Sequence, residues 1–310
     1  MSLMIMINFF LMILMVMLSV AFLTLFERKI LSYMQYRKGP NKLSFKGFMQ
    51  PFSDMLKLLS KEMFYLSLNK IFYYSPMMML IFSSILWINY PWIYNNININ
   101  YNMIFMLFIM SLNVYPILLI SWISMNNYSM LSVMRLISQM ISFEVLLYLI
   151  LFMLMMMIES FSLMKFIFYQ VNIKFSILMY PLYFMFLLSV LIDLNRVPFD
   201  LIEGESELVS GFNLEYYSSL FTMIFLSEYM NLLFISLIIE TLFFGFKFWG
   251  MLFLIFNFFN LIFLVMIRGV LARIRYDLLM YMCWMELLVL LIYYLIYIYL
   301  VKEIIMMINM

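Results

Sequence analysis

The sequence contains uncharged apolar stretches that are too long for the interior of a water-soluble domain. Residues 3–26 carry no charge, and neither does any position from Ile71 to Met134. A helix that crosses a membrane needs about 20 mostly apolar residues, because each residue adds about 1.5 Å across a hydrocarbon core about 30 Å thick. The second stretch is therefore long enough for two crossings, and Pro91 with the Asn-rich segment 95–100 divides it.

Composition supports the same conclusion for the whole chain. Hydrophobic residues make up 67% of the 310 positions and charged residues only 11%, with a mean hydropathy of +1.06. Too few polar side chains remain to cover a surface that faces water. We expect an all-α polytopic membrane protein, a single membrane domain spanning residues 1–310. The hydropathy pattern predicts about eight transmembrane helices, near residues 3–26, 71–90, 101–123, 136–158, 175–192, 216–239, 248–267 and 283–301.

The distribution of positive charge predicts how these helices are oriented. Four of the 18 Lys and Arg residues, Lys165, Lys174, Lys247 and Lys302, fall outside the loops at residues 27–70, 124–135, 193–215 and 268–282. Loops rich in Lys and Arg stay on the side of synthesis. Scarce Ala with abundant Met, Phe, Ile and Asn is typical of AT-rich codon use and suggests an organelle genome. We therefore expect a mitochondrial inner-membrane protein with these loops in the matrix and both termini in the intermembrane space.

Residues 51–66 differ from the predicted spans. After Pro51, apolar side chains recur at helical spacing, whereas Asp54, Lys57 and Lys61 fall on the other face. This pattern is typical of an amphipathic helix that lies in the membrane interface. Two interpretations remain open: a plain surface anchor, or the border of an opening for a lipid-soluble substrate.

The sequence also excludes several kinds of chemistry on this chain. There is no His, and Cys283 is the single Cys, so bis-His haem, His-ligated zinc and a cluster bound by four Cys residues are excluded. The seven Gly residues form no nucleotide-binding motif. We expect no flavin, haem, iron–sulfur cluster or metal on this chain, and a net charge of +2 gives no reason to expect nucleic-acid binding.

Acidic residues inside predicted spans are costly, at about 3 kcal/mol or more each in hydrocarbon. Glu144 and Glu228 lie well inside their helices, whereas Glu215, Glu240 and Glu286 lie closer to helix ends and could reach the headgroups. Each buried carboxyl could be a neutral, hydrogen-bonded structural group. Alternatively, Glu144 and Glu228 could belong to a proton relay.

The segment after the fifth predicted helix is the densest group of ionisable residues. Arg196 stands there among five acids, Asp193, Asp200, Glu203, Glu205 and Glu207. A solvated acidic loop is one interpretation. Interleaved apolar residues such as Phe199 favour partial burial instead, with Arg268, Arg273 and Arg275 on the same side as candidate counter-charges. The acids are weak grounds for a divalent-metal site.

Four strings of residues resemble one family over nearly the whole chain. They are Glu27–Asn41 with Gln50–Glu62, Arg135–Val145, Asn195–Tyr216 and Arg268–Asp277. They resemble the chain 1 family of NADH–ubiquinone oxidoreductase, a membrane subunit of respiratory complex I. The resemblance implies a subunit beneath the peripheral arm that carries flavin and iron–sulfur clusters, with ubiquinone as substrate. Its expected partners are the quinone-module subunits of that arm, the neighbouring membrane-arm subunits and membrane lipid.

The resemblance also implies roles for individual residues. Arg28, Asp54, Arg196, Phe199 and Arg273 would line or support the quinone chamber. The acidic proton relay would comprise Glu144, Asp193, Asp200, Glu203, Glu205 and Glu228. Departures from the family's usual residues occur at Ser32, Ser132, Asp193, Ala272 and Met285, and they leave the local loop geometry open.

Two functions of other classes remain as alternatives: an autonomous proton or cation transporter, and a non-catalytic scaffold. Transporters often contain internal repeats with interrupted helices at matching positions, and we find no such repeat. A scaffold would not need Glu144 and Glu228 in lipid.

Overall fold

A computed structural model describes residues 2–62, 70–90, 100–124, 126–171, 173–201, 211–246 and 250–309. Within these ranges the chain forms helices and no strand, which confirms an all-α polytopic membrane protein. Backbone groups in lipid must be satisfied within the segment that crosses it, and a helix does this. The helices are α1 (Ser2–Met34), η1 (Phe45–Gly47), α2 (Gln50–Leu59), α3 (Ile71–Leu86), η2 (Trp87–Asn89), α4 (Asn102–Ser124), α5 (Asn127–Ile158), α6 (Leu163–Tyr169), α7 (Phe175–Leu178), α8 (Tyr180–Asp193), η3 (Gly211–Asn213), α10 (Ser218–Ile239), η4 (Glu240–Phe244), α11 (Met251–Val270), α12 (Tyr276–Tyr281), η5 (Met282–Leu287) and α13 (Leu288–Asn309).

Seven helical stretches in the described part of the chain are long and apolar enough to cross a membrane. The place of the remaining predicted span is taken by the four-residue α7 and the 14-residue α8, which are separated at Met179. Pro181 follows directly in the first turn of α8, where a missing N–H costs nothing.

Several helices have other bounds than hydropathy predicts. α1 continues past residue 26 to Met34, and α5 begins at Asn127 rather than near residue 136. The predicted loops 27–70 and 124–135 are shorter by these amounts, and the end of α11, α12 and the start of η5 together occupy most of 268–282. A hydropathy run marks the lipid-immersed part of a helix, and good helix formers such as Glu, Arg and Lys can extend it into water.

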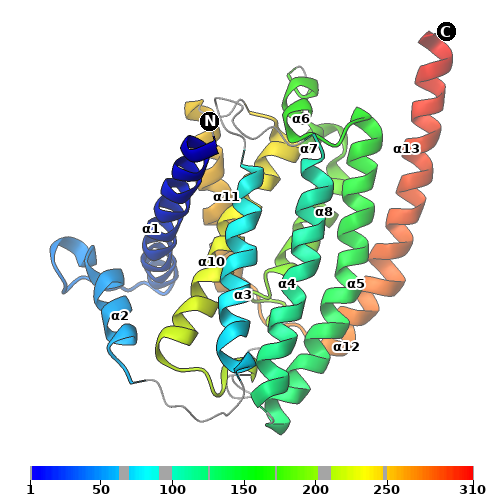
Figure 1. Ribbon diagram of the computed structural model, residues 1–310. Coiled ribbons are helices and arrows are strands. Elements are labelled where there is room, and N and C mark those ends of the chain that lie inside the picture. The colour runs from blue at the N-terminus through cyan, green and yellow to red at the C-terminus, as the bar shows by residue number, and fades with distance from the viewer. Residues whose placement is uncertain are drawn as a thin grey trace.

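The amphipathic segment is also shorter than predicted. α2 ends at Leu59, not at residue 66, and the backbone N–H of Ser60 donates to the carbonyl of Leu56 as the helix stops. The last predicted residues, 63–66, lie outside the described part of the chain. α2 stands beside the bundle, near the end of α1 (Figure 1).

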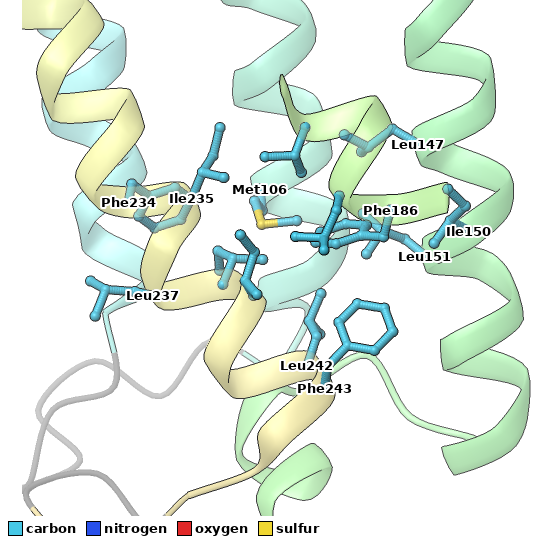
Figure 2. Close-up of a cluster of buried hydrophobic side chains, with 14 of the residues drawn as sticks. Met106, Leu147, Ile150, Leu151, Phe186, Phe234, Ile235, Leu237, Leu242 and Phe243 are labelled. Carbon is cyan, nitrogen blue, oxygen red and sulfur yellow. The ribbon is translucent and has the colours of Figure 1, made fainter. Parts of the chain in front are cut away.

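The long helices lie side by side in one bundle, with the start of α1 and the end of α13 at the same end (Figure 1). We call the other end, where α1 leads to α2 and α11 leads to α12, the basic end. The core is centred on α5, α8 and α10, and Figure 2 shows side chains of α4, α5, α8, α10 and η4 meeting there. Lipid is as apolar as these side chains, so close packing rather than water exclusion stabilises their contacts.

Candidate functional site

A cavity of about 70 Å³ opens between α3, α4, α5, α10 and the segment after α8. A buried water needs about 10–15 Å³ of such space, so the cavity has room for several. Its ionisable lining comes from Asp193, Arg196, Asp200, Glu228 and Arg268, with Asn113, Asn195 and Asn231 as further polar groups. Apolar side chains such as Met79, Met140 and Phe234 form the rest of the wall. A charged, roomy cavity with apolar walls can hold water and shift protonation equilibria.

The segment after α8 brings three of these groups into the cavity. α8 ends at Asp193, and Asn195 then adopts a left-handed conformation with φ 51°, which Asn tolerates better than most residues. The buried Gln139 of α5 holds this turn: its Nε2 donates to the Ile192 carbonyl at 3.2 Å, to Asn195 Oδ1 at 3.2 Å and to the Phe199 carbonyl at 3.4 Å. One side chain therefore fixes the path of the backbone from residue 192 to residue 199.

A buried ionic network centred on Glu27 of α1 holds two of the residues that line the cavity, Arg196 and Arg268. Glu27, 5% exposed, accepts a hydrogen bond from Tyr229 Oη at 2.5 Å and from Arg268, and lies 3.6 Å from Arg196 Nη1. These partners come from α10, from α11 and from the segment after α8. One carboxylate thus joins four parts of the chain that are remote in sequence.

Arg196 lies between Glu27 and the cavity. Its guanidinium stacks 4.4 Å from the centre of the Tyr229 ring, and Nη1 lies 3.5 Å from Tyr229 Oη. Burial alone would lower the pKa of Arg196, but Tyr229 and the charges of Glu27 and Glu228 raise it above its usual value. The guanidinium therefore stays protonated beside the cavity.

Asp200 is paired on the same side of the cavity. Its carboxylate is buried and lies 3.7 Å from Arg273 Nη2. The carbonyl of the neighbouring Pro198 accepts a hydrogen bond from the Ile274 N–H at 3.0 Å. The segment after α11 therefore holds the segment after α8 through both a backbone contact and an ion pair.

Glu144 lies next to this group without lining the cavity. It is half-buried on α5, its Oε1 has no hydrogen-bond partner, and its charge acts on Asp193. Glu144 therefore extends the acidic group of the cavity toward the middle of α5.

Two predicted residues form a separate pair at the edge of the bundle. Arg28 Nη1 lies 2.5 Å from Asp54 Oδ2, and Gln50 Nε2 donates to Asp54 Oδ1 at 2.9 Å. Both charged side chains are partly exposed, and they join α1 to α2 outside the cavity.

Comparison with known proteins decides the family. The NADH dehydrogenase family matches residues 7–299. A protein of Apis mellifera ligustica named NADH-ubiquinone oxidoreductase chain 1 is 56% identical over 299 residues, which is 96% of this chain and 98% of that protein. A protein of the same name from Aedes aegypti is 45% identical over 275 residues, 87% of each chain. This chain belongs to the NADH-ubiquinone oxidoreductase chain 1 family. The resemblance predicted from the sequence is confirmed.

The residues predicted for this family member divide into four groups. Asp193, Asp200, Glu228 and Arg196 line one cavity, and Arg273 and Glu144 lie beside it. Phe199 is buried behind the turn that Gln139 holds, and Arg28 and Asp54 lie at the α1–α2 edge. Glu203 and Glu205 lie outside the described residues.

The sequence did not predict Glu27, Gln139 or Tyr229 as site residues of this chain 1 family member. Glu27 was placed in a loop, whereas it lies inside α1. Its position one residue before Arg28 and Lys29, on the side where basic residues prevail, was the available signal. Gln139 offered a second signal, a long polar side chain in a mostly apolar helix.

Two of the positions expected to depart from the family's usual residues, Ser32 and Ser132, fit their surroundings. Ser32 and Ser132 are buried, and each hydroxyl donates within its own helix, to the Lys29 carbonyl at 2.7 Å and to the Ser129 carbonyl at 2.6 Å. A serine that satisfies its hydroxyl in this way is small enough for close helix packing. Ala272 and Met285 are exposed, so a different side chain at either position does not disturb packing within this chain.

Proposed function

We propose that this chain forms the wall of the quinone chamber and the first part of the proton-coupling path in NADH-ubiquinone oxidoreductase. The names of its relatives support a multi-pass subunit of that enzyme in the mitochondrial inner membrane, with ubiquinone as substrate and the other subunits as partners. Flavin and iron–sulfur groups would belong to those partners, because this chain offers one Cys and no His.

The observation that carries the proposal is the meeting of Asp193, Asp200 and Glu228 with Arg196 and Arg268 around one cavity. Reduction of a quinone to a quinol takes up two electrons and two protons. Carboxyls beside the reacting headgroup respond to this change of charge by shifting their own proton affinities. Acids that share a cavity also titrate as a coupled set, so a proton taken from one is drawn from the others.

We assign different roles to the fixed charges and to the titratable acids of the cavity. Arg196 and Arg268 are anchored by Glu27, so their positive charge stays in place when the quinone gains electrons. Glu144, whose charge acts on Asp193, would carry the response from the cavity into α5. The Arg28–Asp54 pair would lie at the entrance for the lipid-soluble substrate, between α1 and the amphipathic α2.

The test separates quinone-coupled proton transfer from electron entry. In the complex assembled with Asp200→Asn, or with Glu144→Gln, proton pumping driven by quinone reduction should fall about tenfold or more, as for loss of a proton-transferring group. Electron transfer from NADH to an artificial acceptor that bypasses the quinone should stay unchanged.

Asp277→Asn is the matched control, because Asp277 is an exposed acid at the basic end, paired with Arg275 at 2.9 Å. It should leave both activities intact. A normal proton-to-electron ratio in the Asp200→Asn and Glu144→Gln complexes would contradict the proposal.

A further inference from the structure

Glu240 is buried at the end of the bundle opposite the cavity. Its side chain is 0% exposed, and neither carboxyl oxygen has a hydrogen-bond partner. The sequence predicted that Glu240 could reach the headgroups, since it lies near a helix end, and this expectation is wrong. Glu240 is the first residue of η4, and η4 packs against α6, α7, α10 and α11. These neighbouring helices bury its side chain.

The helix is irregular at this residue. η4 is a π-helical turn that begins at Glu240 and ends at Phe244, and the next residue, Gly245, has a left-handed conformation. Turns of this kind occur frequently at functional sites. Gln170, which follows α6, donates from Nε2 to the Leu242 carbonyl at 2.7 Å, while its own Oε1 has no partner. The turn is therefore held from outside, and polar atoms next to it remain unsatisfied.

A second group of unsatisfied polar atoms lies in η2. Asn89 is 2% exposed and neither its Oδ1 nor its Nδ2 has a partner, and Trp87 Nε1 also has none. Trp87 packs edge-on against Phe234 of α10, 6.0 Å between ring centres, and stacks on Tyr90 at 6.2 Å. Tyr90 lies within reach of the Glu240 charge: burial, and then that charge, raise the pKa of its phenol. The aromatic contacts thus connect η2 to α10, six residues before Glu240.

Buried polar atoms are almost always hydrogen-bonded, to protein or to ordered water. A polar site with several free donors and acceptors is where buried water is found, each molecule making about three hydrogen bonds. The donors Trp87 Nε1 and Asn89 Nδ2 and the acceptors Asn89 Oδ1 and Glu240 can together satisfy such water. We propose that Glu240 is a proton-binding site hydrated through Trp87, Asn89 and Tyr90, in exchange with the aqueous phase at this end of the protein.

This site is distinct from the cavity at the basic end. Glu240 follows Glu228 by 12 residues along α10, which is about 18 Å by helical rise. One turn, to Phe244, separates Glu240 from the end of its span. Lys174, at the start of α7, lies near this exit, with its Nζ 3.5 Å from the Gly245 carbonyl and 4.7 Å from the Phe246 ring centre. The proton would therefore exchange with the side opposite the basic end.

Two measurements on the assembled complex test the proposal. The first needs no variant: a high-resolution density map should contain ordered water within hydrogen-bond distance of Glu240 and of Asn89 or Trp87. The proposal would be overturned if the Glu240 carboxyl oxygens were hydrogen-bonded directly to protein groups, if no water lay next to them, or if they held a metal ion.

The second measurement is infrared difference spectroscopy in H₂O and in D₂O. A protonated carboxylic acid band should shift on deuteration and should be lost in Glu240→Gln. It should persist in the control Glu159→Gln, because Glu159 is an exposed carboxylate at the same end, ion-paired with Lys302 at 2.6 Å. A Glu240→Gln spectrum that keeps the exchanging band would overturn the proposal. Neither measurement depends on quinone reduction, so their failure would leave the proposed function standing.

Discussion

Replacing Glu27 by Gln should destabilise the protein far more than loss of a surface charge. Glu27 is the shared acceptor of Arg196, Arg268 and Tyr229, and removal of its charge leaves two guanidinium groups facing each other. Loss of one partner from a buried ion pair costs about 3–5 kcal/mol. The Arg268 side chain is 35% exposed and can regain some hydration, so we expect the lower part of that range, about 3 kcal/mol.

The thermal midpoint of the assembled complex, measured for Glu27→Gln and for Asp277→Asn, gives the comparison. The Arg275–Asp277 pair has side chains 80% and 66% exposed, and pairs of this kind contribute less than about 1 kcal/mol. Glu27→Gln should therefore lower the midpoint clearly and Asp277→Asn hardly at all.

A double variant tests whether the cost arises from unpaired charge. Glu27→Gln with Arg268→Gln removes one of the two facing guanidinium groups, so it should be more stable than the sum of the single changes by about 1 kcal/mol or more. Equal midpoints for Glu27→Gln and Asp277→Asn, or strictly additive single changes, would refute the reasoning.

Three further outcomes are expected elsewhere in the chain. Burial raises the pKa of Tyr216 to about 12, so the stability that its neutral phenol contributes should be complete below pH about 10 and should be lost as the pH rises toward 12. The thermal midpoint of Tyr216→Phe should therefore decline less steeply over that pH range than that of the unmodified protein. Parallel declines would contradict this. Gln139→Leu should cost about 1–3 kcal/mol in thermal unfolding, because the carbonyls that Nε2 satisfies become unpaired, and an unchanged midpoint would argue against its holding the turn. The hydrogen bond and the charge of Lys302 lower the pKa of Glu159. Lys302→Met should therefore return that pKa toward its ordinary value, as measured by carbon-13 titration of the labelled carboxyl. An unchanged titration would show that the pair does not form.

Helix content could be predicted because lipid leaves the backbone few alternatives. Helix ends could not be predicted equally well. Glu27, Arg28 and Lys29 end the apolar run, yet they are good helix formers, and α1 continues through them to Met34. The division of one predicted span into α7 and α8 falls at Met179, two residues before Pro181, and a hydropathy run does not register such a break.

The sequence predicted several residues of the candidate site but not the contacts that hold them together. Asp193, Arg196, Asp200 and Glu228 were selected from their charge and their motif, and they meet around one cavity. The contact of Glu27 with Arg268 joins positions 241 residues apart, and no local pattern encodes such a pair. Glu240 illustrates the reverse error, because closeness to a helix end predicted exposure where tertiary packing buries the side chain completely.

The number of protons translocated per electron, measured in proteoliposomes containing the complex with Glu228→Gln, tests the account most directly. Glu228 lines the cavity, and its charge acts on Arg196. If the acids of the cavity couple quinone reduction to proton movement, this ratio should fall while NADH oxidation by an artificial acceptor proceeds at the normal rate. An unchanged ratio in an intact complex would contradict the account.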